Sequence, residues 1–309
     1  MKGTPIVAHL VFAVLIGSSF VTASVLADSI YLSTFDSNTI LRFDSDGNES
    51  AFATAASGLN YPYGLAFDGN GNLYVANSGG GNGNSTIEKL TSNGNGSVFA
   101  STGLSYPTGL AFDSIGNLFV ANAGNNTIEE FNSGGTGSVF ATSASGIDSP
   151  EGLAFDRNGN LFVANAANIE EFNSSGTGLV FATSGVSNPQ GLAFDSNGDL
   201  YVANAGNNTI EKFNTSGQGS IFTSTNLLRY PIGLAFDSSG DLYVANHFTG
   251  SILEFNSDGV GSVFASGLDN AVYLAIDEIP EPSASALLLL GLGLSALAVC
   301  HRRRRAAPE

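Results

Sequence analysis

The sequence predicts an all-β fold: a six-bladed β-propeller of four-stranded blades, flanked by a signal helix and a transmembrane helix at its two ends. The main observation is a repeat, Gly-Leu-Ala-Phe-Asp, which occurs five times before a degenerate sixth copy, Tyr-Leu-Ala-Ile-Asp. The final aspartates of the copies are Asp68, Asp113, Asp156, Asp195, Asp237 and Asp277. Their spacing of 39 to 45 residues with strand-like content is typical of propeller blades. Gly or Asn also interrupts every apolar run, which disfavours helices.

Each repeat contains four short apolar segments separated by polar turns. The order is Gly-Leu-Ala-Phe-Asp, then Leu-Tyr/Phe-Val-Ala-Asn, then Thr-Ile-Glu-Glu/Lys-Phe, then Ser-Val-Phe-Ala. Strands one, two and four are apolar at nearly every position, which predicts burial on both faces of each sheet. The Asp-x-x-Gly turns lack the spacing of an EF-hand loop, so we expect them to be turns that cap a strand.

The two ends of the array predict how it closes. Residues 29–33, 39–43 and 50–52 match strands two to four of a unit, and no first strand precedes them. Residues 267–277 align without a gap onto 103–113. We therefore expect the last segment to supply the inner strand of the first blade. Such closure gives six blades and leaves no open end in the array.

The N-terminal segment, residues 1–27, has the features of a secretory signal peptide. Lys2 supplies a positive charge, an apolar stretch follows from Ile6 to Val21, and small residues precede an expected cleavage after Ala27. An uncleaved membrane anchor is the alternative. The propeller is expected to occupy residues 28–278.

The C-terminal segment, residues 279–309, has three parts in a fixed order. Pro280, Glu281 and Pro282 come first, an apolar run at 284–300 follows, and Arg302, Arg303, Arg304 and Arg305 end it. The 17-residue run would span about 26 Å as a helix, close to the thickness of a bilayer core. The arginines place its end in the cytoplasm, and hence residues 28–278 outside the inner membrane.

This tail resembles the PEP-CTERM sorting signal of Gram-negative bacteria. The resemblance implies a membrane protease of the exosortase type as partner, which cuts near Pro-Glu-Pro. It also implies a transient inner-membrane anchor and a mature protein in the cell envelope or extracellular matrix. A permanent single-pass anchor is the alternative.

Charge and composition exclude several function classes. Between residues 28 and 278 there are 25 acidic and five basic residues, a net charge of −20. Such a surface is repelled by nucleic acid and by anionic lipid. One Cys and three His in the chain exclude a disulfide framework and a Cys-rich zinc site.

The repeat resembles the NHL-repeat and gluconolactonase-like propeller superfamily. A proline precedes the Gly-Leu-Ala-Phe-Asp motif in five copies, and Tyr-Val-Ala follows in the second strand at 74–76 and 201–203. Asparagine stands where that family usually has aspartate, at Asn77, Asn122, Asn165, Asn204 and Asn246. The superfamily includes metal-dependent lactonases and lyases that use histidine.

The candidate site lies at the axis of the ring. The residue between Pro and Gly is expected to point toward the axis, on the face that also carries the loops after the five asparagines. These axial residues are Tyr63, Thr108, Glu151, Gln190 and Ile232, with Val272 in the sixth copy. Glu151 is the one ionisable group among them apart from Tyr63. His247 is unusual because three of the other copies have Ala after this asparagine and one has Ser.

We expect a non-enzymatic binding or scaffold module of the cell surface or exopolysaccharide matrix. Its loops are rich in Asn, Gly and Ser, which suit a carbohydrate or a protein ligand. The alternative is a divergent lactonase- or lyase-like enzyme with a divalent metal in the central channel, using Glu151 and His247. We expect no cofactor; the alternative is a calcium ion bound by Glu151 and nearby asparagine oxygens.

Overall fold

The computed structural model describes residues 13–16, 19–22, 28–81 and 83–277, which fall into two compact units. One unit contains the hairpin β1 (Ala13–Ile16) and β2 (Ser19–Thr22). This part of the expected signal helix is therefore a pair of strands, consistent with its β-branched and aromatic residues. Among the described residues, no helix is long and apolar enough to cross a membrane. The helix expected at 284–300 and the sorting residues 280–282 and 302–305 lie outside them.

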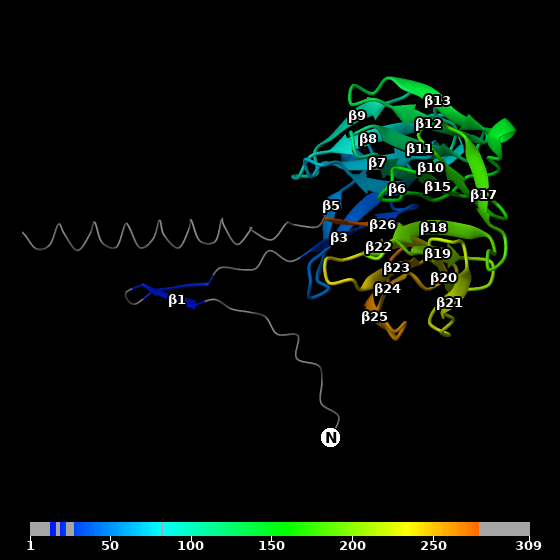
Figure 1. The fold of residues 1–309 in the computed structure, drawn as a ribbon. Helices are drawn as coiled ribbons and strands as arrows, with labels where there is room; N and C mark the ends of the chain where they lie inside the picture. Colours follow the sequence, from blue (N-terminus) through cyan, green and yellow to red (C-terminus); the bar gives the residue numbers. More distant parts are fainter. Residues whose placement is uncertain (1–12, 17–18, 23–27, 82, 278–309) are drawn as a thin grey trace, which may run out of the picture. The chain divides into compact units, whose positions relative to one another are not determined.

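The other unit is a six-bladed propeller, as the sequence predicts (Figure 1). Blade 1 is built of β26 (Ala271–Asp277), β3 (Ser29–Thr34), β4 (Thr39–Phe43) and β5 (Glu49–Ala53). Blade 2 has β6 (Pro62–Phe67), β7 (Leu73–Asn77), β8 (Thr86–Leu90) and β9 (Gly96–Ala100). Blade 3 has β10 (Pro107–Phe112), β11 (Leu118–Asn122), β12 (Thr127–Phe131) and β13 (Gly137–Thr142).

The remaining blades follow the same order. Blade 4 has β14 (Leu153–Phe155), β15 (Leu161–Ala164), β16 (Ile169–Phe172) and β17 (Gly178–Ala182). Blade 5 has β18 (Pro189–Phe194), β19 (Leu200–Asn204), β20 (Thr209–Phe213) and β21 (Gly219–Thr223). Blade 6 has β22 (Pro231–Phe236), β23 (Leu242–Asn246), β24 (Ser251–Phe255) and β25 (Gly261–Ser266).

The C-terminal strand closes the ring. β26 pairs antiparallel with β3, with Leu274 opposite Leu32 and Asp277 opposite Ser29. Each inner strand also contacts the inner strand of the next blade, and β26 contacts both β22 and β6. The predicted closure of blade 1 by the end of the chain is therefore confirmed (Figure 1).

Burial decreases from the second strand of a blade to its outer edge. Every residue of β7, β11, β19 and β23 is buried. The fourth strands differ from the sequence-based expectation, because their central aliphatic residues are exposed. These residues are Val98, Val139, Val180, Ile221 and Val263. The fourth strand is the outermost strand of its blade and pairs with only one other strand. An apolar sequence in this strand therefore does not require that both of its faces are buried.

Aromatic side chains hold neighbouring blades together. The aromatic residue of each second strand packs edge-on against a phenylalanine on the fourth strand of the same blade. In five blades it also packs against a phenylalanine on the inner strand of the next blade. In blade 3, Phe119 lies 5.0 Å from Phe140 and 5.0 Å from Phe155 of blade 4, measured between ring centroids. Each such pair stabilises the fold by about 0.5–1.5 kcal/mol beyond the contribution of its buried area.

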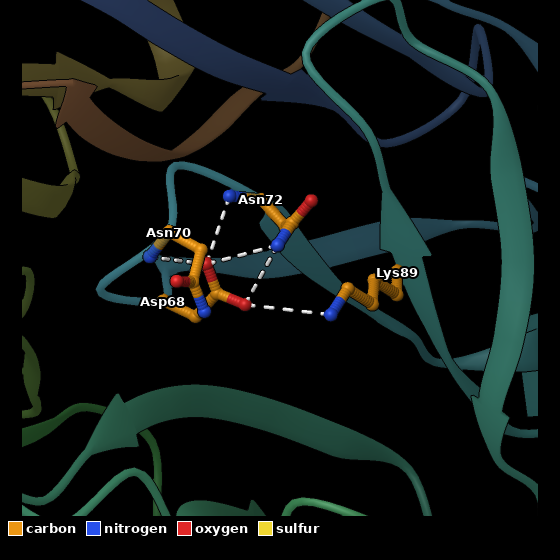
Figure 2. Close-up of polar contacts among 4 residues, drawn as sticks. All are labelled: Asp68, Asn70, Asn72 and Lys89. Carbon is orange, nitrogen blue, oxygen red and sulfur yellow. Dashed lines mark hydrogen bonds and ion pairs between the residues drawn. The ribbon is translucent and has the colours of Figure 1, made fainter.

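The turns after the first strands define the lower face of the propeller. In blade 2, Asp68 Oδ1 accepts hydrogen bonds from the backbone N–H groups of Asn70 and Asn72, both at 2.9 Å (Figure 2). Its Oδ2 lies 3.4 Å from Nζ of Lys89. The aspartates of these turns therefore act as caps, as expected from the sequence. The loops after the second strands lie at the opposite ends of the strands and define the upper face.

Four buried glutamates make the stability of the propeller pH-dependent. Glu88, Glu129, Glu170 and Glu211 lie on the third strands, and burial raises the pKa of each. The pKa of Glu88 is raised from 4.5 to about 6. The folded state therefore holds the proton more tightly than the unfolded state. This contribution to stability is fully present below pH 4.5 and is lost as the pH rises to about 6.

We expect Glu88→Gln to stabilise the propeller at pH 7.5 by about 1 kcal/mol, after allowance for solvent screening, and to have little effect at pH 4.5. Urea unfolding at the two pH values measures the difference. Glu49→Gln, at an exposed position on β5, is the control. An equal effect of Glu88→Gln at both pH values would contradict the assignment.

Candidate functional site

The predicted axial residues lie on the inner strands of the blades or directly before them. Five of them precede the glycine of the repeat motif, and these glycines lie against the backbone of the next blade. A Cβ atom on Gly109 would stand 2.2 Å from the carbonyl oxygen of Glu151, and one on Gly152 would stand 2.2 Å from that of Gln190. The N–H of Gly109 also donates to Glu151 O at 2.8 Å. The inner strands thus pack so closely that a side chain at these glycines would clash with the neighbouring backbone.

Tyr273 is the exception, and it fills the channel. It stands where the other five copies have glycine, and it is 8% exposed. Its hydroxyl group donates to the backbone oxygen of Gln190 in blade 5 at 3.4 Å. The hydroxyl oxygen of Tyr273 also lies 3.1 Å from the position of a Cβ on Gly152 in blade 4. A side chain from blade 1 therefore crosses the axis and closes the centre of the ring. The candidate site is therefore the group of axial side chains on the upper side of this residue, which we call the mouth.

Glu151 is the charged group of this mouth. Burial raises its pKa to about 7. Among the described residues, its buried Oε2 has no hydrogen-bond partner. Burial, followed by the charge of Glu151, raises the pKa of Tyr63, Tyr106 and Tyr273, so all three rings lie near this carboxyl group. A buried carboxylate oxygen without a donor is costly, and it marks a position where a ligand donor would be favoured.

The other axial side chains divide the mouth into a polar and an apolar half. Thr108 Oγ1 donates to Pro150 O at 2.9 Å, and Gln190 Nε2 donates to Pro189 O at 3.3 Å. On the opposite side, Ile232 and Val272 are buried in one cluster with Tyr273, and Tyr63 packs against it. The rings of Tyr63 and Tyr273 are 5.5 Å apart. The mouth therefore offers an apolar wall opposite the Glu151 carboxyl group.

A ring of residues with left-handed backbone surrounds the mouth. In each blade the residue that precedes the proline position has φ between 43° and 58°. These residues are Tyr61, Tyr106, Ser149, Asn188, Tyr230 and Asn270. Bulky residues rarely adopt this conformation, and its cost of about 1–3 kcal/mol is often found at functional sites. The sequence analysis did not identify these tyrosines. The repeated Tyr-Pro pairs at 61–62, 106–107 and 230–231 were the available signal.

His247 belongs to an aromatic cluster at the rim. It begins the short helix η4 (His247–Thr249), and its Nδ1 lies 3.1 Å from Ala271 O. The ring of Tyr230 stacks on Phe248 with centroids 4.7 Å apart, and Phe248 is 72% exposed. No hydrogen bond or ion pair within the described residues joins His247 to Glu151. The structure therefore places His247 with aromatic groups rather than in a dyad with the carboxyl group.

The five predicted loop asparagines are buried and hydrogen-bonded within the fold. In blade 3, Asn122 Oδ1 accepts from the N–H of Ser105 at 3.1 Å, and its Nδ2 donates to Gly103 O at 2.8 Å. Asn77, Asn165, Asn204 and Asn246 make the same pair of bonds. These side chains hold the segment that leads into the first strand of each blade. They position the upper loops and leave no free group for a ligand.

The axial residues supply a weak donor set for a metal ion, because Glu151 is the one carboxylate among them. In the part of the chain that the structure describes, no group of three or more His, Cys, Asp or Glu side chains is placed to hold a metal ion. The charge of Glu151 acts on Tyr63 and Tyr106, and the asparagine oxygens expected to help it hold calcium are bonded to backbone N–H groups. The residues present therefore do not fit the calcium alternative.

Comparisons with known proteins agree with the repeat and the tail. Residues 187–213 match the NHL repeat family, and residues 278–304 match the PEP-CTERM protein-sorting motif. A search of curated proteins found no match to the sequence.

Solved structures share the fold at low sequence identity. A chain of the nidogen/laminin complex is 20% identical, with a TM-score of 0.71, and the match covers 81% of this chain and 98% of that one. Virginiamycin B lyase from Staphylococcus aureus is 16% identical, with a TM-score of 0.63 and coverage of 81% and 85%. A catalytically inactive variant of that lyase with quinupristin is 15% identical, with a TM-score of 0.61 and coverage of 82% and 94%. The protein is thus an exported six-bladed propeller that contains a match to the NHL repeat. A PEP-CTERM sorting motif directly follows the last strand of the propeller.

Proposed function

We propose that this protein is a non-enzymatic binding module of the cell envelope or extracellular matrix, and that it binds a neutral carbohydrate chain at the upper mouth. The observation that carries the proposal is the buried Oε2 of Glu151, which has no partner among the described residues and lies among tyrosines. A sugar hydroxyl group would donate to this oxygen. The C–H face of the same ring would pack against an aromatic side chain.

The charge distribution favours a neutral ligand. Residues 28–278 have a net charge of −20, so an anionic polymer would be repelled. Lys89 and Lys212 form ion pairs with Asp68, Asp195 and Asp199 on the lower face, away from the mouth. A neutral glycan avoids both the general repulsion and the cost of burying an unpaired charge.

The binding test uses an array of neutral oligosaccharides, followed by calorimetry on the ligand that binds best. Glu151→Gln and Tyr106→Ala are each expected to weaken binding about tenfold, the value of one charge-assisted hydrogen bond or one aromatic contact. Glu49→Gln, an exposed change on the outer strand β5, is the control and should bind normally. The proposal fails if no neutral glycan binds or if Glu151→Gln binds as well as the parent protein.

Binding should strengthen as the pH rises through about 7. A hydroxyl group that donates to Glu151 favours the carboxylate over the protonated acid, whose pKa burial raises to about 7. We therefore expect tighter binding at pH 8 than at pH 6, and no such dependence in Glu151→Gln. Calorimetric titrations at the two pH values measure this. The same dependence in both proteins would assign the pH effect to another group.

A lyase- or lactonase-like activity is the second candidate, because a carboxyl group with a pKa of about 7 is suited to general acid–base catalysis. A titration with calcium, zinc and manganese separates the two candidates. Tight binding of one divalent ion that Glu151→Ala abolishes would favour the enzyme. Glycan binding that is unaffected by chelators would favour the binding module.

The sorting motif supports a route of the protein to the surface. We propose that the signal segment is cut after Ala27 and that an exosortase-type protease cuts near 280–282, which releases the propeller from the inner membrane. Intact mass measurement of the extracellular protein tests both cuts. A mass that includes residues 284–300 would instead indicate a permanent anchor.

A further inference from the structure

The upper loop of blade 6 carries an aromatic side chain that the fold does not need. Phe248 is the second residue after the buried asparagine, where the loops of blades 3 and 5 have Gly124 and Gly206. The backbone makes the same hydrogen bond in each case. The N–H group of Phe248 donates to Arg229 O at 3.2 Å, and that of Gly124 donates to Ser105 O at 3.0 Å. Phe248 is nevertheless 72% exposed, so the folding of the loop gives no reason for a phenylalanine here.

Tyr230 supports Phe248 from the segment that leads into the first strand of the same blade. The two rings stack with centroids 4.7 Å apart and planes inclined by 25°. The N–H group of Tyr230 donates to Asn208 Oδ1 at 2.7 Å, and its hydroxyl group accepts a hydrogen bond from Asn188 Nδ2 at 3.3 Å. A ring held in this way loses little conformational entropy when a ligand packs against the pair. We call Tyr230 and Phe248 the platform.

The platform is continuous with the apolar side of the mouth. Tyr230 and Tyr63 both pack against the buried cluster that contains Ile232. Burial raises the pKa of Tyr63, and the charges of Glu151 and Tyr230 add to this effect, so both groups lie near its hydroxyl group. Apolar contacts therefore lead from Phe248 through Tyr230 to Tyr63, beside the carboxyl group of Glu151.

We propose that a neutral glycan chain lies across the mouth and the platform, with one sugar ring at Glu151 and another on Phe248. This inference rests on the proposed function and specifies its ligand, which is an oligosaccharide of several sugar units and not a monosaccharide. The upper loops of blades 3, 4 and 5 contain only Ala, Gly and Asn, at 123–126, 166–168 and 205–208. The platform thus gives the chain one favoured direction away from Glu151.

Charge and geometry favour a sugar over other occupants of an aromatic surface. The net charge of −20 between residues 28 and 278 repels nucleic acid and disfavours a second copy of this chain. The platform supplies a flat apolar area for the C–H face of a sugar ring. The hydrogen bond comes from Oε2 of Glu151, which has no partner among the described residues. The two parts of the surface therefore recognise different rings of one chain.

The test uses the neutral glycan that binds best in the array, prepared in lengths of one to six sugar units. We expect the affinity of the parent protein to rise with chain length and then to level off. The protein contains no tryptophan, so Phe248→Trp places a single fluorescent reporter on the platform. The emission of this variant should shift to shorter wavelength with the long chains and not with the shortest chain that binds.

Phe248→Ala separates the platform from the mouth. It is expected to weaken binding of the six-unit chain about three- to tenfold, the value of one aromatic contact, and to leave the shortest chain that binds unaffected. Glu151→Gln should weaken the binding of both lengths. Ile115→Ala is the matched control, because it removes an exposed apolar side chain from the lower turn of blade 3. It should change the binding of neither length.

An affinity that does not depend on chain length would overturn the proposal. So would a Phe248→Ala variant that binds the long chain normally, or an emission shift in Phe248→Trp that follows protein concentration without glycan, which would assign the platform to a second copy. Failure of the proposed function looks different. If no neutral glycan binds, both proposals fall. If Glu151→Gln binds every length normally while Phe248→Ala still weakens the long chain, the role of Glu151 falls and the platform stands.

Discussion

A propeller truncated after Asn270 is expected not to fold. The truncation removes β26 and with it Ala271, Val272, Tyr273 and Leu274, all of which are buried. Losing a large buried side chain typically costs about 2–5 kcal/mol, so the summed loss exceeds the roughly 5–15 kcal/mol that stabilises a domain. It also exposes the edge of β3. Circular dichroism and calorimetry of residues 28–270 should show no cooperative unfolding transition.

Two comparisons make this result specific. Residues 28–278 should unfold cooperatively under the same conditions. A chain in which Asp277 alone is changed to Asn should also fold, because it keeps the whole strand. A cooperative transition of unchanged midpoint in the truncated chain would show that the ring does not depend on β26.

Gly109→Ala is expected to be among the most destabilising additions of a single methyl group to the propeller. The added Cβ would lie 2.2 Å from Glu151 O and would break the 2.8 Å hydrogen bond from Gly109 to that oxygen. Neither backbone can move without opening the contact between blades 3 and 4. We expect destabilisation of about 4 kcal/mol or more, in the range of the most severe single substitutions. Urea unfolding provides the measurement.

Gly69→Ala is the matched control. This glycine lies in a lower turn, has no other group within 4 Å of its Cβ position and does not have positive φ. The same methyl group should be neutral there or slightly stabilising, because it restricts the unfolded chain. If Gly109→Ala is as mild as Gly69→Ala, the inner strands are not packed as closely as described.

The fold could be predicted because it repeats. Six copies of one motif fix the blade count, and the alignment of residues 267–277 onto 103–113 predicts that the last strand completes the first blade. Hydrophobicity alone does not distinguish an edge strand from a central one. For that reason the burial expected for the fourth strands was wrong at residues such as Val98 and Ile221.

The site was only partly predictable. Position within the repeat grouped Glu151 with the other axial residues, and in the structure the charge of Glu151 acts on Tyr63 and Tyr273. The same reasoning placed Asn122 among ligand-facing groups, whereas its amide is used to hold the chain between blades. A buried amide and an exposed one look alike in a loop sequence. Only three-dimensional contacts reveal which backbone groups need a partner.

Tyr273 shows where a departure from the repeat carried information. The sequence identifies it as the one residue that replaces the motif glycine. Its hydroxyl group reaches the backbone oxygen of Gln190 in blade 5, a contact that the repeat does not predict. Irregular copies in a repeat protein therefore merit attention as positions where symmetry no longer determines the contacts.

Hydrogen exchange of the segment 271–277 tests ring closure most directly, and the mouth and the filled channel both depend on that closure. If β26 is an integral strand, its amides should exchange as slowly as those of β22, at 231–236, and only through global unfolding. Exchange of β26 as fast as that of the exposed turn at 44–48 would contradict closure and the description of the site that depends on it.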